Sequence, residues 1–261
     1  MLVRVTKSNF EDFRKGCGYE HVFGSRALTA FMAYGEDHPV HRFWLSIGEE
    51  KVDAVLHLNG SVLTVIKNHP STDEDPIIDD ILEICDCRDI DEIDSDWDLC
   101  EILHERMRGY TESSYYMEYK GGKIRGDFAD IKPASLMHVF CVLQQSHEYY
   151  RTHLKFEPWA EHLENCINAG CTRVYQLERD GQVIGTGSII SQDETHAAIA
   201  AVAVIPEYRL QGLGSYITNF LVGEIQKMGK TPCLISGYDE VAELYKKIDF
   251  VPVGRWGELY I

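Results

Sequence analysis

The sequence predicts an α/β fold in which helices cover a mixed β-sheet, and three observations favour it. Short apolar runs typical of strands alternate along the chain with stretches of helical periodicity. Asn59-Gly60 and Asp180-Gly181 each separate two such strand runs and are strong signals for two-residue hairpin turns. The length of 261 residues, with 44% apolar and 26% charged residues, suits a globular protein with one large domain or two small ones.

The first half is predicted to be a mixture of helices and strands. Ser8-Asn9-Phe10-Glu11 has the pattern of a capping box, which satisfies free N–H groups at the start of a helix. The further elements expected are a second short helix after Ser25, strands at 41–47, 51–58 and 61–67, a helix after Pro76, a strand near 90–93, a helix near 97–107 and a strand near 113–120.

The second half gives a clearer pattern, and Gly121-Gly122 is predicted to link it to the first. We therefore expect two domains, residues 1–121 and residues 122–261. The run 196–205 is small and apolar throughout, which predicts a strand buried on both faces of the sheet. The other elements expected are helices after Pro133 and from Pro158 to Gly170, strands at 173–178 and 182–191, a helix at 215–228, a strand at 231–236, a helix at 240–248 and a strand from Phe250.

Charge and composition narrow the classes of partner. The net charge is −17, and residues 1–120 carry 12 basic and 25 acidic residues. Such acidity argues against nucleic acid and anionic membranes as partners, because phosphates would be repelled. The sequence has no apolar run of transmembrane length and no apolar stretch typical of a signal peptide, so we expect a cytoplasmic protein. The eight cysteines lack zinc-ligand spacing, so we expect reduced thiols and no metal.

The segment from Val202 to Ser215 carries the most chemical information. It begins as a buried strand that ends at Pro206, and it continues through a loop with Gly212 and Gly214 into an amphipathic helix. A helix N-terminus offers unpaired N–H groups and a positive dipole end, and glycines allow a ligand to approach the backbone closely. The segment is therefore predicted to bind a diphosphate, with Arg209 as an additional cation.

The segment 202–215 does not match two common phosphate-binding motifs, but it is similar to a third. A Rossmann fingerprint would need glycine at position 217, and a P-loop would need Lys after Gly214; the sequence has Ile217 and Ser215. Instead, V-x-V-x-P at 202–206 followed by R-x-x-G-x-G at 209–214 resembles the coenzyme A diphosphate loop of the GNAT superfamily of acetyl-CoA-dependent N-acyltransferases. The segment DEVAELYKKIDF at 239–250 is similar to the family's N-x-x-A-x-x-L-Y-x-x-x-G-F segment, and the resemblance covers roughly residues 125–261.

The resemblance implies a GNAT-like acyl-CoA N-acyltransferase fold and acetyl-CoA as the cosubstrate. It implies that the backbone of 202–204 pairs with the pantetheine arm and that N–H groups of the following loop bind the diphosphate. Asp239 stands where the family often has Asn, and Asp249 where it has Gly. The predicted cofactor-binding residues are Val202, Ala203, Val204, Arg209, Leu210, Gln211, Gly212, Leu213, Gly214, Ser215, Asp239 and Ala242.

Tyr245 is the predicted catalytic residue. It matches the tyrosine that many family members use to protonate the departing thiolate, and a phenol can donate to a thiolate. The alternative is a core tyrosine on the helix face shared with Val241 and Leu244. The strand at 196–205 has no carboxylate to act as a base. His196 either serves as the base or lies at the surface, or the amine loses its proton to water.

Acceptor recognition is predicted at the junction of the first two helices of the second half. A carboxylate beside aromatic rings there would hold a cationic amine, although packing of a tyrosine-rich helix end on the core is an equal alternative. The residues concerned are Gln145, Ser146, His147, Glu148, Tyr149 and Tyr150.

The strand–hairpin–helix–strand–helix–strand order of the first half resembles a shortened copy of the same fold, and this copy is degenerate because residues 1–120 contain no R-x-x-G-x-G. We expect it to shape the acceptor cleft or to dock rigidly on the second half. The leading hypothesis is an N-acetyltransferase acting on a primary amine of a small molecule or peptide. The alternatives are a non-catalytic acetyl-CoA sensor and an interaction protein whose acidic half binds basic partners; a homodimer is also possible.

Overall fold

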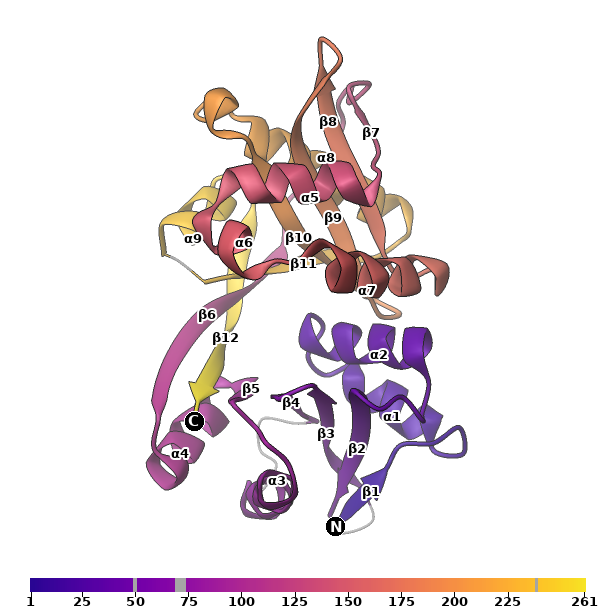
Figure 1. Ribbon diagram of the computed structural model, residues 1–261, viewed down its shortest axis with the longest axis vertical. Coiled ribbons are helices and arrows are strands. Elements are labelled where there is room, and N and C mark those ends of the chain that lie inside the picture. The colour runs from indigo at the N-terminus through magenta and orange to yellow at the C-terminus, as the bar shows by residue number, and fades with distance from the viewer. Residues whose placement is uncertain (49–50, 69–73, 238) are drawn as a thin grey trace.

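The computed structural model describes residues 1–48, 51–68, 74–237 and 239–261. These residues form a twelve-stranded sheet with associated helices, elongated along the axis that is vertical in Figure 1. The N-terminal half lies at the bottom and the C-terminal half at the top, and the long strands β6 and β12 run between them. In the order of the sheet the strands are β1 (Leu2–Arg4), β2 (His41–Ile47), β3 (Val52–Asn59), β4 (Val62–Lys67), β5 (Glu92–Asp96), β12 (Phe250–Tyr260), β6 (Tyr110–Tyr119), β11 (Thr231–Ser236), β10 (His196–Val204), β9 (Gln182–Gln192), β8 (Arg173–Arg179) and β7 (Ile131–Pro133).

The strand order is symmetric about the pair β12–β6. The parallel pair β4–β5 in the first half matches the parallel pair β10–β11 in the second. β6, which ends the first half of the chain, pairs with β11 of the second half, whereas β12 pairs with β5 of the first. Each half therefore completes its sheet with the last strand of the other, and the two halves share one continuous set of backbone hydrogen bonds.

The helices follow the same repeat. In the view of Figure 1, α5 and α7 lie in front of the strands of the C-terminal half. The helices are α1 (Phe10–Cys17), α2 (Phe23–Tyr34), α3 (Asp75–Cys87), α4 (Trp97–Met107), α5 (Leu136–Ser146), α6 (Glu148–His153), α7 (Phe156–Asn168), α8 (Leu213–Lys227) and α9 (Asp239–Lys246). Within the described ranges, every helix is too short or too polar to span a membrane.

The halves also pack directly against each other through α2 and the loop before it. Phe23 stacks on Trp256 of β12 with ring centroids 3.9 Å apart. The buried hydroxyl groups of Ser25 and Ser191 lie 2.7 Å apart and share a hydrogen bond. The apolar cluster around Phe13 and Phe43 continues into Ala198 and Cys233 of the second half. This packing supports the expectation that the first half docks rigidly on the second.

Most predicted elements are confirmed, with two local corrections. α1 forms where it was predicted, but the capping box is wrong: Asn9 is the N-cap, and no side chain caps the helix. Asn59 belongs to β3, so the tight turn lies at Gly60 and Ser61, with Gly60 at φ +64°. At the second hairpin, Asp180 and Gly181 both have positive φ, as that turn type requires. The short strands β1 and β7 and the short helix α6 were not predicted.

We predict that residues 122–261 do not fold alone, because they lack β6. Because this fragment lacks β5 as well as β6, β11 loses the partner on one edge and β12 loses both of its partners, and exposed edges promote aggregation. A fragment of residues 110–261, which contains β6, should be measurably more soluble than the fragment of residues 122–261. Circular dichroism and urea titration of the two fragments test this. A cooperative unfolding transition for residues 122–261 alone would contradict it.

Candidate active site

A cavity of about 870 Å³ lies where β10, the start of α8, α9 and the α5–α6 junction meet, and it extends to β6 and β12. It thus joins the segment predicted to bind a diphosphate with the predicted catalytic tyrosine. The lining residues are Glu112, Ser146, His147, Tyr149, Tyr150, Val202, Ala203, Val204, Tyr208, Arg209, Leu210, Leu213, Gly214, Val241, Leu244, Tyr245, Glu258 and Tyr260.

The cavity begins where two parallel strands separate. In the described part of the chain, β10 pairs with β11 only through His196–Ala198, although β10 continues to Val204. A bulge follows on the β9 side, where the register slips between Ala200 and Ala203, and Ala201 has φ +53°. Bulges bend a strand and are frequent beside active sites. As a result, the segment 202–204 lines the cavity and, within the described segments, has no strand partner on the β11 side.

The N-terminus of α8 is suited to an anion. Its N-cap is Gly212 at φ +74°, and no side chain caps the free N–H groups of the first turn. A Cβ added to Gly214 would meet no atom within 4 Å, and this glycine lines the cavity. Gly187 of β9 lets α8 approach the sheet, because a Cβ there would lie 2.6 Å from Ile217. The open space over the first turn therefore fits a diphosphate.

Arg209 and Leu210 form the rim of this anion site. The Arg209 guanidinium donates to the carbonyl oxygen of Val204 over 3.1 Å and to that of Ser146, so it ties the end of β10 to the end of α5. Leu210 is fully exposed and has φ +60°. A left-handed, exposed leucine is strained, and such strain concentrates where a backbone is held for a ligand. The loop thus presents its backbone and a fixed cation to the cavity.

Tyr245 lies on α9 and lines the same cavity. Its ring packs on Phe250 with centroids 5.7 Å apart, which fixes the direction of the phenol. Burial raises the pKa of Tyr245 to about 12, and the nearby Tyr150 phenol adds to the shift. The phenol is therefore protonated at neutral pH and able to donate a proton inside the cavity.

Comparison with known proteins agrees with this geometry. Residues 138–250 match the model of the acetyltransferase (GNAT) family. The chain contains a GNAT domain. The comparison with curated protein sequences found no match.

Solved structures share the fold over nearly the entire chain, beyond the GNAT domain. A tandem GNAT protein from the clavulanic acid biosynthesis pathway has 11% identity and a TM-score of 0.63, covering 99% of this chain and 97% of that one. A GNAT-family acetyltransferase from Colwellia psychrerythraea has 11% identity and a TM-score of 0.62, covering 100% and 99%. A GCN5-related N-acetyltransferase from Sphaerobacter thermophilus has 11% identity and a TM-score of 0.63, covering 99% and 94%. At this identity the likeness shows the fold, which comprises two GNAT-like halves.

The predicted cofactor-binding residues of the GNAT domain occupy different positions around the cavity. Gln211, Gly212 and Ser215 belong to the same loop and helix start but do not line the cavity. Asp239 is exposed at the start of α9, and Ala242 is buried in the core. The predicted residues that do line it are Val202, Ala203, Val204, Arg209, Leu210, Leu213 and Gly214.

His196 lies away from the cavity, between the two halves. Its ring stacks on that of His21 with centroids 3.6 Å apart, and His21 hydrogen-bonds Asp193 over 2.7 Å. Among the described residues these three have potential metal-ligating atoms within 4.8 Å of one another. Two nearly parallel stacked rings do not converge on one ion, so the geometry favours a contact that joins the halves. The reading of His196 as a surface residue is wrong, because its side chain is only 13% exposed.

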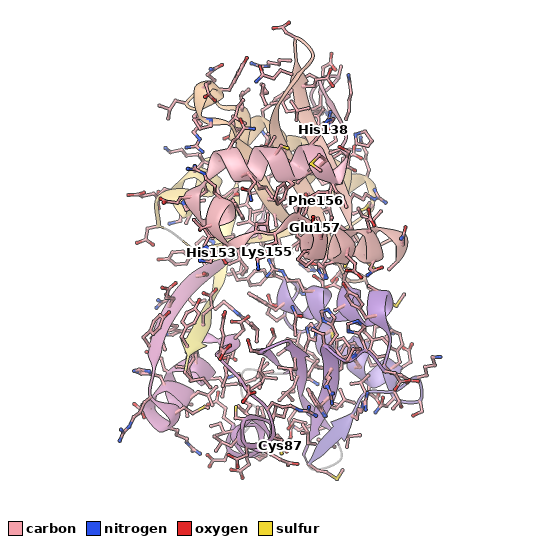
Figure 2. The ribbon with its side chains drawn as sticks, in the orientation of Figure 1. Cys87, His138, His153, Lys155, Phe156 and Glu157 are labelled. Atoms are coloured by element: carbon pink, nitrogen blue, oxygen red, sulfur yellow. The ribbon has the colours of Figure 1, made fainter. Side chains whose placement is uncertain are left out.

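The predicted acceptor segment reaches the cavity in part. Ser146, His147, Tyr149 and Tyr150 line it, whereas Gln145 and Glu148 do not. Figure 2 labels His153 and Lys155, which follow this segment at the level where the two halves meet, and Cys87, which lies at the far end of the N-terminal half. Sequence reasoning missed Tyr208 and three residues from β6 and β12, namely Glu112, Glu258 and Tyr260. Only the pairing of these two strands brings those three together.

Carboxylates on three neighbouring strands face the same side of the sheet beside the GNAT domain. Asp94 of β5 lies directly opposite Glu258 of β12, which in turn lies opposite Glu112 of β6; these three form the carboxylate row. Burial and the nearby charges of Glu92 and Glu258 raise the pKa of Asp94 to about 8. Burial, with repulsion from Glu258 and Glu112, also raises the pKa of Glu92.

We predict that Asp94→Asn flattens the pH dependence of stability. The native state keeps a proton on Asp94 between about pH 4 and pH 8, where the unfolded chain has lost it, so the free energy of unfolding falls as pH rises through this window. The slope contributed is at most about 1.4 kcal/mol per pH unit. Urea unfolding of both proteins at about pH 5, 6, 7 and 8 measures it. Parallel curves for the two proteins would contradict the assignment.

In the N-terminal half, the point where β4 and β5 separate corresponds to the point where β10 and β11 separate, and it is filled by an ion pair. β4 pairs with β5 only through Val62–Thr64, so these strands also separate beyond that point. Lys67 lies there, 7% exposed, and its ammonium contacts Glu74 and, at 3.1 Å, Asp96. Burial lowers the pKa of Lys67, but its hydrogen bonds to Glu74 and Asp96 outweigh burial and raise it. A side chain thus occupies the point where the GNAT domain leaves open space.

We predict that Lys67→Met destabilises the protein by about 2 kcal/mol, because it leaves two partly buried carboxylates without their cation. The affinity of the cavity in the second half for a diphosphate ligand should be unaffected, because Lys67 does not line that cavity. Chemical unfolding and calorimetry measure the two quantities separately. Loss of this ligand affinity with unchanged stability would show that the N-terminal half carries the anion site instead.

Proposed function

We propose that the protein is an acetyl-CoA-dependent N-acetyltransferase that moves an acetyl group to a primary amine. The observation that supports this most is the meeting, in one cavity, of the uncapped N-terminus of α8, the free edge of β10 and the Tyr245 phenol. These three features match the diphosphate, the pantetheine arm and the leaving thiolate of the cosubstrate.

In the proposed reaction the neutral amine attacks the thioester carbonyl carbon directly. The C–N bond forms as the C–S bond breaks, and a backbone N–H of the 202–204 segment stabilises the developing oxyanion. Tyr245 donates its proton to the sulfur and regains one from solvent. The ammonium of the free substrate loses one proton to water before it attacks, and the nitrogen loses a second proton to water as the amide forms, since neither His196 nor a carboxylate of β10 lies in the cavity.

Release of coenzyme A thiol from acetyl-CoA, measured against a panel of amines, tests the proposal. Turnover with at least one amine, and none without an amine, is expected. Binding of acetyl-CoA without turnover of any amine would instead support the sensor. Absence of acetyl-CoA binding would exclude both functions.

A further inference from the structure

The carboxylate row is not needed for acetyl transfer, although Glu112 and Glu258 line the same cavity as Tyr245. Like charges directly opposite on neighbouring strands destabilise a sheet. Asp94 keeps its proton at neutral pH, so the unfavourable contact is the one between Glu258 and Glu112, which lie directly opposite each other. A bound cation would relieve the repulsion between these two carboxylates.

Asp94 is the buried end of the row, and its side chain shares a hydrogen bond with Glu92. Its side chain is 8% exposed, and its Oδ1 atom has no hydrogen-bond partner. It lines a second cavity of about 350 Å³ between the two halves, together with Arg26.

The protein's own cations do not neutralise the row. Among the described lysines and arginines, none forms an ion pair with Glu92, Asp94, Glu112 or Glu258. Arg26 acts on Asp94 only at longer range. The region therefore keeps a negative potential that favours positively charged ligands and opposes ligands with carboxylates.

Aromatic rings surround the acidic end of the large cavity. Tyr260 stacks on Tyr110 with centroids 4.6 Å apart, and its hydroxyl donates to Glu258 over 3.0 Å. Tyr149, Tyr150 and Tyr208 line the same cavity. Aromatic faces beside carboxylates bind ammonium groups and the methylene chains attached to them.

We infer that the acceptor is an aliphatic diamine or polyamine, with one amine at Tyr245 and a second, charged amine held by Glu112 and Glu258. This inference rests on the proposed function and specifies its substrate class. The distal ammonium keeps its proton and takes no part in bond making. Acetylation converts the reacting amine into a neutral amide and leaves the contact between the distal ammonium and the two carboxylates unchanged.

Three acceptors of equal length separate the contribution of the distal group: 1,5-diaminopentane, pentylamine and 5-aminopentanoate. They present the same reacting amine, followed by a positive, a neutral or a negative end. We expect kcat/KM for the diamine to exceed that for pentylamine by about 30-fold or more, as for hydrogen bonds to charged groups. The value for 5-aminopentanoate should be lower than that for pentylamine.

The double variant Glu112→Gln/Glu258→Gln should bring the diamine-to-pentylamine ratio of kcat/KM close to one. Glu207→Gln, which removes an exposed carboxylate that does not line the cavity, is the matched control and should keep the wild-type ratio. Circular dichroism and the unfolding midpoint establish that each variant is folded.

Equal kcat/KM for the diamine and pentylamine would overturn the inference while leaving the proposed acetyl transfer intact. If acetyl-CoA binds but no amine turns over, the proposed function fails, and calorimetry with spermidine decides the inference separately. Spermidine binding that is lost in the double variant supports the carboxylate row as a polyamine site. Spermidine binding no tighter than that of pentylamine overturns it.

Discussion

Replacing Tyr245 with Phe should lower kcat by about 100- to 1,000-fold, the usual contribution of a positioned general acid, with acetyl-CoA affinity little changed. The substitution removes one hydroxyl group and keeps the ring that packs on Phe250. Because the pKa of Tyr245 is raised to about 12, the wild-type phenol stays protonated through neutral and moderately alkaline pH. Ionisation of Tyr245 should therefore produce no loss of activity below about pH 11. Steady-state kinetics of thiol release measure both effects.

Tyr19→Phe is the matched control, because Tyr19 is 58% exposed and does not line the cavity. It should keep wild-type kcat. A Tyr245→Phe enzyme with wild-type kcat would assign Tyr245 to core packing, which is the alternative that the sequence leaves open.

Replacing Gly214 with Asp should weaken acetyl-CoA binding by about 100-fold or more without unfolding the protein. A Cβ at this position meets no atom within 4 Å, so the new side chain is accommodated. A carboxylate in the first turn of a helix is favourable for the helix itself. It would, however, occupy the space proposed for the diphosphate and repel it. Calorimetry gives the affinity, and thermal unfolding gives the stability.

Two further substitutions in α8 separate charge from position. Asn219→Asp adds the same charge farther along the helix and outside the cavity lining, and it should change affinity by less than about 3-fold. Gly214→Ala adds a methyl group without charge, and its loss of acetyl-CoA affinity should lie between those of Asn219→Asp and Gly214→Asp. If Asn219→Asp and Gly214→Asp weaken binding equally, a general repulsion explains the loss, and the anion site lies elsewhere.

The elements of the second half could be predicted because their signals are local. The turn at Asp180-Gly181 depends only on these two residues adopting positive φ angles. The strand–loop–helix pattern at 202–215 is marked by Pro206 and the two glycines within the segment itself. α6 was missed because it has only 6 residues and no buried side chain, so apolar periodicity gives no signal. The bulge at Ala201 was missed because nothing in a run of alanines marks the left-handed residue.

The acidic end of the cavity could not be predicted for a different reason. Glu112 and Glu258 are 146 residues apart and become neighbours only because β6 and β12 exchange places between the halves. Strand exchange depends on the relative stability of whole sheets, and no local pattern records it. Gly121-Gly122 separates the two halves in the sequence, but the sheet continues across this boundary because β6 pairs with β11. Whether residues 122–261 fold alone tests the predicted domain boundary directly.

The central claim is that the turn entering α8 binds the diphosphate of a thioester carrier. Titration of the intact protein with acetyl-CoA and with acetyl-pantetheine, which lacks the diphosphate, tests it most directly. We expect acetyl-CoA to bind with a dissociation constant of about 1–100 μM and acetyl-pantetheine at least about 100-fold more weakly. Equal affinity for the two, or no binding of acetyl-CoA, would contradict the claim.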